Sequence, residues 1–462
     1  MRSCTRLGIL IAVVLALVWP SGAARAQAVP PANPVLRADV ITEVTPLGWQ
    51  VVAVALQFAH RLDLRGAVNA TSAFSITATL DGATGSRTVV DVYSNNAAEV
   101  DRQGAEGRRG SYLIIELDPN DPNAGALRYD PVAGINNPLQ LVGAYTVRQN
   151  ADVLDHRGNV VLPAPAFGIT NQGVISPIVD DFTTMSFTDS AGTTLNFRLF
   201  QPEAYRSSPQ SRRTYPLVVF LHGGGERGLN NITQITANQG AVAFADPQRQ
   251  ATDPSFVLAP QVPTPRTNNW TTPAIQAALL ELIDAVTNSY PINEDRLYLT
   301  GLSMGAFGSF DLLPQHPDKF AAALLIAGGG NAEEMPLITD LPMWITHSID
   351  DPTVDYVTGS LANVNALEAA GAQVTRGAWP GNLPERAAEA EARRLWRTAE
   401  RNGSHILFTT YLAGTTPVSP HWSWVPTYSN DVMLDWLFSQ RRSGNQPSSV
   451  AGHNGNLLTA TR

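Results

Sequence analysis

RLYLTGLSMGAFGSF, from Arg296 to Phe310, is the stretch from which the fold can be inferred. It reads as an apolar strand, a sharp turn with Ser303 at its tip, and then a helix. The turn Gly301–Gly305 has the pattern G-x-S-x-G, in which the two glycines let the strand and helix backbones approach closely. The serine hydroxyl would then stand above a sheet, at a helix N-terminus that favours negative charge. The alternative is a helix start that Ser303 merely caps.

Apolar strands alternate with helices from residue 179 to residue 442, which predicts an α/β fold with a mostly parallel sheet and helices on both faces. Such sheets bind ligands at the carboxyl ends of their strands. Loops of unusual composition follow His222, Thr300 and His347, and all three belong to that edge. We expect the flanking strands at Met185–Phe187, Leu195–Pro202, Leu217–His222, Phe256–Pro260, Phe320–Ala327, Met343–Thr346 and His405–Leu412, and helices at Thr233–Ala245, Thr272–Thr287, Val357–Ala370 and Val432–Gln440.

A serine hydroxyl becomes a good nucleophile only when a base takes its proton and an acid orients that base. In α/β-hydrolases these groups follow one another in the order Ser, Asp or Glu, His. His421 lies after the last expected strand and is our candidate base. Asp351 is our candidate acid, and Asp350 stays open because both precede Pro352 in one loop. His222 and His347 are interpreted as residues that fix loops through hydrogen bonds.

Attack by a serine creates an oxyanion, which backbone N–H groups stabilise. Met304, the residue after the nucleophile, is expected to supply one donor. The loop Gly223-Gly224-Gly225 is expected to supply the other, from Gly224 or its neighbour Gly225. A phosphate cradle is the rival interpretation, but the loop lacks the G-x-x-x-x-G-K-[ST] pattern.

Residues 27–178 have the pattern of an all-β domain. Short alternating runs are separated by turn clusters, which predicts an immunoglobulin-like β-sandwich. The run Asp118–Asn123 resembles a calcium loop but lacks the later bidentate glutamate, so we interpret it as a turn. The expected strands are Asp39–Val44, Trp49–Phe58, Phe74–Leu80, Arg87–Tyr93, Ser111–Leu117 and Leu139–Val147.

Residues 1–26 have the charged start, short apolar core and A-x-A end of a cleaved signal peptide. We therefore expect a secreted or periplasmic protein with no stable membrane anchor. Cys4, the only cysteine, lies in this segment, so the mature chain would hold no thiol. Cleavage lowers the formal net charge from −9 to −12, because the segment holds three arginines and no acid. That charge argues against nucleic acid as a partner.

Four motifs together resemble secreted bacterial α/β-hydrolase esterases, related to polyhydroxybutyrate depolymerases, that carry an immunoglobulin-like N-terminal domain. The motifs are His222-Gly-Gly-Gly-Glu-Arg-Gly, Gly301-Leu-Ser-Met-Gly, His347-Ser-Ile-Asp-Asp-Pro and His421-Trp-Ser-Trp-Val-Pro-Thr-Tyr. The resemblance implies Ser303 as nucleophile, Asp351 as acid and His421 as base, with Met304 and the glycine loop as oxyanion hole. It also implies a pocket, to which we assign Glu226, Trp270, Trp424 and Tyr428. Core packing is the alternative role for these aromatic residues.

One segment departs from the family pattern. Residues 378–404 read as an insertion that contains a highly charged helix, Pro384–Arg401. We expect either a small cap over the site or a helix packed on the sheet away from it. The tail from residue 443 to residue 462 is rich in Ser, Gly, Asn and Pro and is expected to be disordered.

These features together predict a secreted serine esterase that needs no metal and no cofactor. Its substrate would be a small ester, a polyester or an acylated polysaccharide, and the N-terminal domain could assemble a homo-oligomer. A serine peptidase of the same fold is one alternative, because it would use the same three residues. A non-catalytic protein that binds a glycan or a partner through the sandwich is the other.

Overall fold

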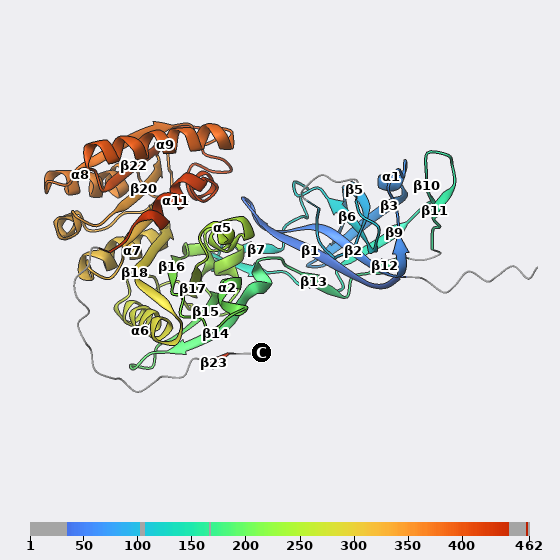
Figure 1. The fold of residues 1–462 in the computed structure, drawn as a ribbon, viewed down its shortest axis with the longest axis horizontal. Helices are drawn as coiled ribbons and strands as arrows, with labels where there is room; N and C mark the ends of the chain where they lie inside the picture. Colours follow the sequence, from blue (N-terminus) through green and yellow to red (C-terminus); the bar gives the residue numbers. More distant parts are fainter. Residues whose placement is uncertain (1–34, 102–106, 166–167, 443–458, 461–462) are drawn as a thin grey trace, which may run out of the picture.

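The computed structural model describes residues 35–101, 107–165, 168–442 and 459–460. They form two lobes, an N-terminal β-sandwich and a larger α/β lobe (Figure 1). The expected signal peptide and residues 443–458 of the expected disordered tail lie outside the described residues. Of the described helices, none combines the length and the apolar character needed to span a membrane.

The N-terminal lobe is the predicted β-sandwich, with two sheets that enclose an apolar core. Side chains alternate between core and solvent along β3, where every second residue from Phe74 to Leu80 is buried. One sheet has the order β13-β1-β2-β6-β5, from β1 (Val35–Thr45), β2 (Gly48–Leu62), β5 (Val89–Asn95), β6 (Gly110–Leu117) and β13 (Gly173–Ile175). The other has the order β12-β9-β3-β4, from β3 (Phe74–Leu80), β4 (Ala83–Arg87), β9 (Tyr145–Gln149) and β12 (Ile169–Thr170). Smaller elements are α1 (Ala70–Ala73), β7 (Leu127–Asp130), β8 (Ile135–Pro138), β10 (Val153–Leu154) and β11 (Val160–Leu162).

Two strand predictions in the sandwich are wrong. The expected strand Arg87–Tyr93 is divided, because the chain passes from one sheet to the other after Arg87. The buried Arg87 guanidinium fixes this crossing: it donates to Asp121 at 3.0 Å and to the carbonyl of Val51 at 3.0 Å. The expected strand Leu139–Val147 begins only at Tyr145, since the chain turns before it, with Ala144 N donating to the carbonyl of Leu141.

The α/β lobe is built on a sheet of ten strands among the described residues, in the order β21-β22-β20-β19-β18-β16-β17-β15-β14-β23. The strands from β21 to β17 are parallel, and β15, β14 and β23 continue the sheet in antiparallel pairs. Their bounds are β14 (Phe182–Thr188), β15 (Thr194–Phe200), β16 (Tyr215–Leu221), β17 (Phe256–Gln261), β18 (Ile292–Leu302), β19 (Ala322–Ile326), β20 (Met343–Ser348), β21 (Val374–Trp379), β22 (Ile406–Tyr411) and β23 (Thr459–Ala460). Thr459 and Ala460 pair with β14, so the prediction of disorder is wrong for these two residues.

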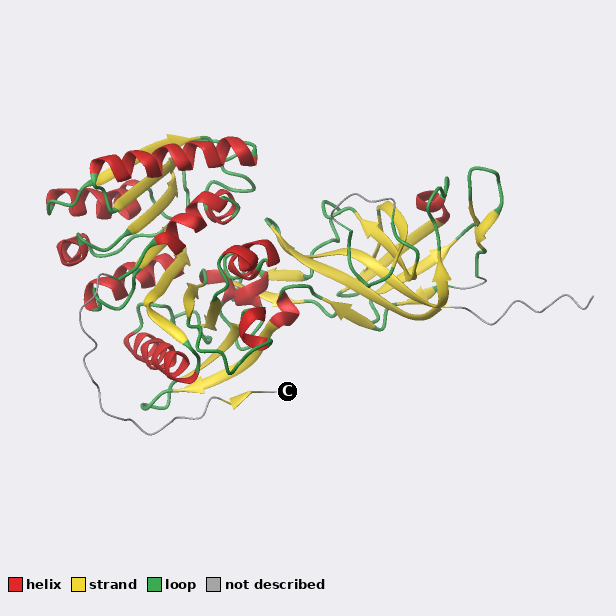
Figure 2. Cartoon of the chain, in the orientation of Figure 1, coloured by secondary structure: helices red, strands yellow, loops and turns green. Residues whose placement is uncertain are grey.

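Helices cover both faces of this sheet (Figure 2). Alternate side chains of β16 enter the two cores: Leu217 and Leu221 pack with α6 (Pro273–Ser289), α7 (Met304–Gln315) and α8 (Ala362–Ala369). Val218 and Phe220 pack on the opposite face with α4 (Val242–Ala245), α9 (Glu385–Asn402) and α11 (Asp431–Ser439). The remaining turns are η1 (Val179–Asp181), α2 (Glu203–Arg206), η2 (Gly224–Glu226), α3 (Thr233–Thr236), α5 (Pro247–Thr252), η3 (Ala332–Ile338), the π-helical turn η4 (Val357–Leu361) and α10 (Trp424–Tyr428).

The helix expected over Thr233–Ala245 is two short turns, α3 and α4. The chain between them passes so close to β16 that a Cβ on Gly240 would lie 2.1 Å from the Phe220 ring. The Asn238 side chain accepts a hydrogen bond from Gly240 N at 2.8 Å and closes this bend. The close packing of the chain on the sheet therefore interrupts the helix.

Residues 378–404 are not a cap over the site. Their first residues complete β21, an edge strand that the sequence analysis missed, and α9 is the crossover helix from β21 to β22. The face of α9 that carries Ala392, Leu395 and Ala399 is buried in the core on that side of the sheet. Most charged residues of α9 are exposed, so the structure matches the second expectation, a helix packed on the sheet.

Leu395→Ala should lower the free energy of unfolding by about 3 kcal/mol, because Leu395 is only 5% exposed and packs against the backbone of β21 at Gly377. Urea unfolding followed by tryptophan fluorescence would measure the change. Arg393→Ala, on the exposed face of the same helix, is the matched control and should shift stability by less than about 0.5 kcal/mol. Equal effects of the two substitutions would contradict the packing of α9 on the sheet.

Candidate functional site

The turn around Ser303 is as tight as its glycines require. A Cβ on Gly305 would lie 1.9 Å from the carbonyl oxygen of Leu221, and one on Gly301 would lie 2.6 Å from the backbone of Gly305. Ser303 itself has φ 51° and ψ −119°, a conformation that L-residues rarely adopt. Its N–H donates to the carbonyl of Ile326 at 2.9 Å, which holds the strained residue in place between β18 and α7.

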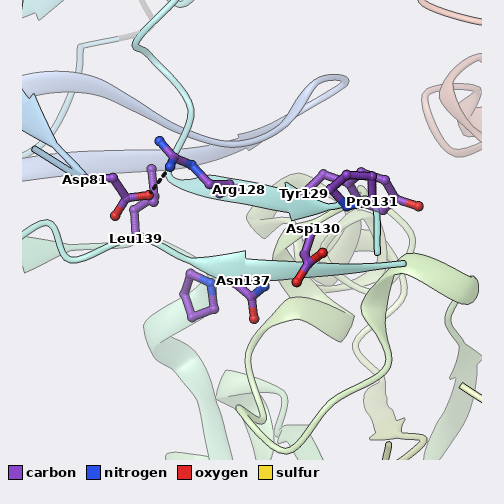
Figure 3. A pocket seen from close by; sticks show the side chains of 8 residues that line it. Asp81, Arg128, Tyr129, Asp130, Pro131, Asn137 and Leu139 are labelled. Atoms are coloured by element: carbon purple, nitrogen blue, oxygen red, sulfur yellow. Dashed lines mark ion pairs between the residues drawn. The ribbon is translucent and has the colours of Figure 1, made fainter. Parts of the chain in front are cut away.

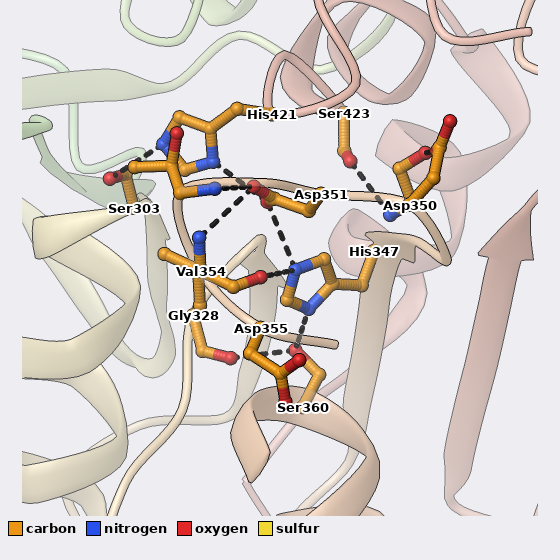
Figure 4. Close-up of polar contacts among 12 residues, drawn as sticks. Ser303, Gly328, His347, Asp350, Asp351, Val354, Asp355, Ser360, His421 and Ser423 are labelled. Atoms are coloured by element: carbon orange, nitrogen blue, oxygen red, sulfur yellow. Dashed lines mark hydrogen bonds and ion pairs between the residues drawn. The ribbon is translucent and has the colours of Figure 1, made fainter. Parts of the chain in front are cut away.

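Three side chains from three loops meet at this turn (Figure 4). His421 Nε2 lies 3.0 Å from Ser303 Oγ, and His421 Nδ1 lies 2.7 Å from Asp351 Oδ2. Because the carboxylate accepts a hydrogen bond from Nδ1–H, Nε2 carries no proton and is free to accept the one on Ser303. Ser303 follows β18, Asp351 follows β20, and His421 follows β22, all at the carboxyl edge of the sheet. This arrangement can remove a proton from Ser303 Oγ.

Asp351 and Asp350 have different surroundings. The Asp351 side chain is fully buried, which by itself would raise its pKa. Hydrogen bonds from His347, His421 and the N–H of Val354 outweigh burial and hold the pKa of Asp351 well below its usual range. Asp350 points elsewhere: its carboxylate accepts from the Ser348 hydroxyl and from Gly414 N. The geometry therefore brings Asp351, and not Asp350, to His421.

The glycine loop after β16 lies beside the serine. A Cβ on Gly223 would lie 2.8 Å from the Leu302 side chain and 3.7 Å from Ser303 Cβ. Gly224 and Gly225 begin the short helical turn η2, and Met304 begins α7. The first N–H groups of a helix have no partner within it. The amides of Gly224, Gly225 and Met304 lie at these helix starts and are the candidate oxyanion donors.

His222 fixes the start of the glycine loop. Its Nδ1 donates to the carbonyl of Gly223 at 2.6 Å, and its Nε2 accepts from Val262 N at 3.0 Å. Burial lowers the pKa of His222 to about 3, so the ring stays neutral and keeps this tautomer. The indole of Trp270 donates to the carbonyl of His222 at 2.9 Å. His222 therefore holds the loop by hydrogen bonds, as the sequence indicated.

Glu226 lies buried beneath the glycine loop. The residue is buried, and a Cβ on Gly223 would lie 2.9 Å from its Oε2. Its carbonyl accepts from Gln261 Nε2 at 2.9 Å and from Thr233 Oγ1 at 3.1 Å. Burial raises the pKa of its carboxyl group to about 7. The structure thus gives Glu226 the role of an anchor for the turn η2.

The aromatic residues assigned to the pocket divide into two groups. Trp424 packs edge-on against the His421 ring, with centroids 5.1 Å apart, and Trp422, which the sequence analysis did not single out, stacks on Trp424. Trp270 is buried below the glycine loop and is 1% exposed. The Tyr428 hydroxyl bonds to Thr300 Oγ1 at 2.8 Å within the core, so Tyr428 has the alternative role of core packing.

The β-sandwich reaches the glycine loop through the hairpin of β7 and β8. Asn136 Nδ2 on β8 donates to the carbonyl of Gly225 at 3.2 Å, and a Cβ on Gly225 would lie 4.0 Å from the ring of Tyr129 on β7. The hairpin also borders a hollow of about 370 Å³ (Figure 3), lined by Asp81, Arg128, Tyr129, Asp130, Pro131, Asn137, Pro138 and Leu139. Sequence reasoning missed this contact, because no local pattern shows which loops of two domains meet.

Glu226→Gln tests the buried carboxyl group. Between about pH 4.5 and pH 7 the unfolded chain releases a proton that folded Glu226 retains, so this residue makes the folded state less stable as the pH rises. The free energy of unfolding of Glu226→Gln, relative to that of wild type, should therefore increase by about 3 kcal/mol between pH 4.5 and pH 7. Above pH 7 this difference should stay constant. Urea unfolding at a series of pH values would measure the gain, with the exposed Glu294→Gln as control. A pH-independent difference between Glu226→Gln and wild type would contradict the raised pKa.

Two family models match the chain. Residues 37–162 match the esterase Ig-like N-terminal domain, and residues 188–368 match the Esterase family. No curated protein is similar enough in sequence to match.

Solved structures are also similar to this chain. A thermostable esterase is 32% identical, with a TM-score of 0.73, over 88% of this chain and 100% of that chain. A ferulic acid esterase is 11% identical, with a TM-score of 0.35, over 53% of this chain and 98% of that chain. The feruloyl esterase module from Clostridium thermocellum complexed with sinapinate is 12% identical, with a TM-score of 0.38, over 58% of this chain and 91% of that chain. The last two add nothing to the fold or the function at these scores.

Proposed function

Because the chain belongs to the family of esterases that carry an immunoglobulin-like N-terminal domain, we propose that it hydrolyses esters through Ser303, His421 and Asp351. The family and the structural relative make it a hydrolase that acts on carboxylic esters. The observation that carries the assignment of residues is the hydrogen-bonded chain from Ser303 Oγ through the His421 ring to Asp351.

In the first half of the proposed reaction, His421 Nε2 takes the proton of Ser303 Oγ as the oxygen attacks the ester carbonyl. The carbonyl oxygen becomes an oxyanion, which accepts hydrogen bonds from Met304 N and from the amides of Gly224 or Gly225. Imidazolium then gives its proton to the alcohol oxygen as the carbon–oxygen bond breaks. The alcohol leaves, and the acyl group remains on Ser303.

In the second half, a water molecule occupies the place of the alcohol, and His421 takes one of its protons as the water attacks the acyl carbon. Collapse of the second tetrahedral intermediate returns the proton to Ser303 Oγ and releases the acid. Asp351, buried and ionised, orients His421 and stabilises the imidazolium in both halves.

We also propose that the chain is exported, since residues 1–26 have the sequence of a signal peptide. Small esters, polyesters and acylated polysaccharides all remain within the proposed substrate class. Trp424 packs against His421, and the half-buried Trp422 stacks on Trp424, so apolar rings lie next to the reacting groups.

Ser303→Ala should lower kcat for p-nitrophenyl acetate about 10⁴-fold or more, because the variant has no nucleophile. It should also fail to react with a fluorophosphonate probe, while circular dichroism and the melting temperature stay close to wild type. Ser208→Ala, at an exposed serine, is the control and should keep full activity and labelling. Substantial turnover or labelling by Ser303→Ala would refute the assignment.

Asn136→Ala should lower kcat about 3- to 10-fold and leave KM within about 2-fold. The variant removes the hydrogen bond to the Gly225 carbonyl, so the neighbouring amides are held less firmly where the oxyanion forms. Steady-state kinetics on a short-chain p-nitrophenyl ester would show the change. Asn137→Ala is the matched control, since its side chain faces the hollow and solvent on the same strand. Unchanged kcat in Asn136→Ala would count against a role for the hairpin.

A further inference from the structure

A second histidine contacts the carboxylate of Asp351. His347, at the end of β20, is fully buried, and its Nε2 lies 3.1 Å from Asp351 Oδ2, the same oxygen that accepts from His421. Nε2 also lies 3.1 Å from the carbonyl oxygen of Val354. Both neighbours are acceptors, so Nε2 carries a hydrogen and donates hydrogen bonds to them. The two histidine rings therefore hold one carboxylate oxygen between them (Figure 4).

The surroundings of His347 leave its ring little freedom. Nδ1 lies 2.9 Å from Ser360 Oγ, and this hydroxyl reaches the carbonyl of Gly328 at 2.8 Å. Tyr356 packs edge-on against the ring, with centroids 5.6 Å apart. A Cβ on Gly359 would lie 3.5 Å from His347 Cε1 and 3.0 Å from Gly328 O. The Nε2–H bond is thus aimed at Asp351 by contacts on both sides of the ring.

The other carboxylate oxygen is held by the loop itself. Asp351 Oδ1 accepts from Thr353 N at 2.8 Å and from Val354 N at 3.0 Å. These amides restrain Oδ1, but only the two histidines donate to Oδ2 among the described contacts of this group. A buried carboxylate is stable only when its oxygens have such donors. His347 is therefore the group that keeps Oδ2 in place while His421 exchanges protons.

We propose that His347 is a positioning residue for ester hydrolysis: through its Nε2–H it fixes Asp351, and through Asp351 it fixes His421 opposite Ser303. This role rests on the proposed function and goes beyond it, because His347 touches neither substrate nor nucleophile. It predicts that the donor at the Nε2 position acts directly on Asp351, and that the contact at Nδ1 contributes only by orienting the ring.

A pair of amide variants separates these positions. The amide nitrogen of His347→Gln can occupy the place of Nε2, whereas that of His347→Asn can only occupy the place of Nδ1. We expect His347→Asn to lower kcat about 10- to 100-fold with KM within about 2-fold, and His347→Gln to stay within about 5-fold of wild type. Kinetics on p-nitrophenyl acetate, with melting temperatures for both variants, would provide the comparison. Equal losses in the two variants would overturn the proposal.

A double-mutant cycle tests whether His347 acts through Asp351. Asp351→Ala should lower kcat strongly by itself, and His347→Asn should then lower it by less than about 2-fold more. Full additivity of the two losses would overturn the proposal. If Asp351→Ala and Ser303→Ala both kept wild-type turnover, the proposed function itself would fail, and this result is distinct from a failure confined to His347.

Ser360→Ala provides the test if His347→Asn does not fold. It removes the partner of Nδ1 and leaves the imidazole, so it should lower kcat about 3- to 10-fold with little change in KM. A wild-type kcat in this variant would overturn the proposed restraint of the ring.

Discussion

The backbone of Gly305 packs directly against the end of β16, and the position of Ser303 depends on this contact. There is no room for a side chain between Gly305 and the carbonyl of Leu221. That contact brings the start of α7 against β16 directly after Ser303, which has φ 51°. The chain that leaves Leu221 becomes the glycine loop within two residues. One constraint therefore places Ser303, the proposed nucleophile, beside the glycine loop.

A second constraint is the buried negative charge of Asp351. A carboxylate without solvent needs donors, and here they come from its own loop, from the end of β20 and from the loop after β22. The charge thus connects segments that are far apart in the sequence. His421, the proposed base, is oriented by this connection and reaches Ser303. His347 bonds to the same carboxylate but does not contact the serine.

The sequence predicted those parts of the site that follow from strand order and local spacing. Ser303, Asp351 and His421 each follow a strand whose carboxyl end lies at the same edge, so their meeting could be expected. The choice between Asp350 and Asp351 could not be predicted, because both lie in one turn and differ only in the direction of their side chains. The edge strand β21 was not predicted because only Thr375 and Trp379 are buried in this partly polar stretch. Without that strand, the charged helix α9 looked like an insertion. Tyr428 and Trp424 lie one helical turn apart, and periodicity does not show which of them reaches the site.

The position of the β-sandwich against the α/β lobe could not be predicted from the sequence. Its contacts with that lobe include one at the glycine loop. The turn between β1 and β2 lies against α3, where a Cβ on Gly48 would be 3.2 Å from the carbonyl of Ala237. The tip of the β7–β8 hairpin lies against Arg266, and Asn136 bonds to Gly225. Of these contacts, the bond from Asn136 reaches the glycine loop directly. The Gly225 carbonyl belongs to the turn whose amides are proposed to bind the oxyanion, so Asn136 is the residue through which the sandwich can influence the geometry of the site.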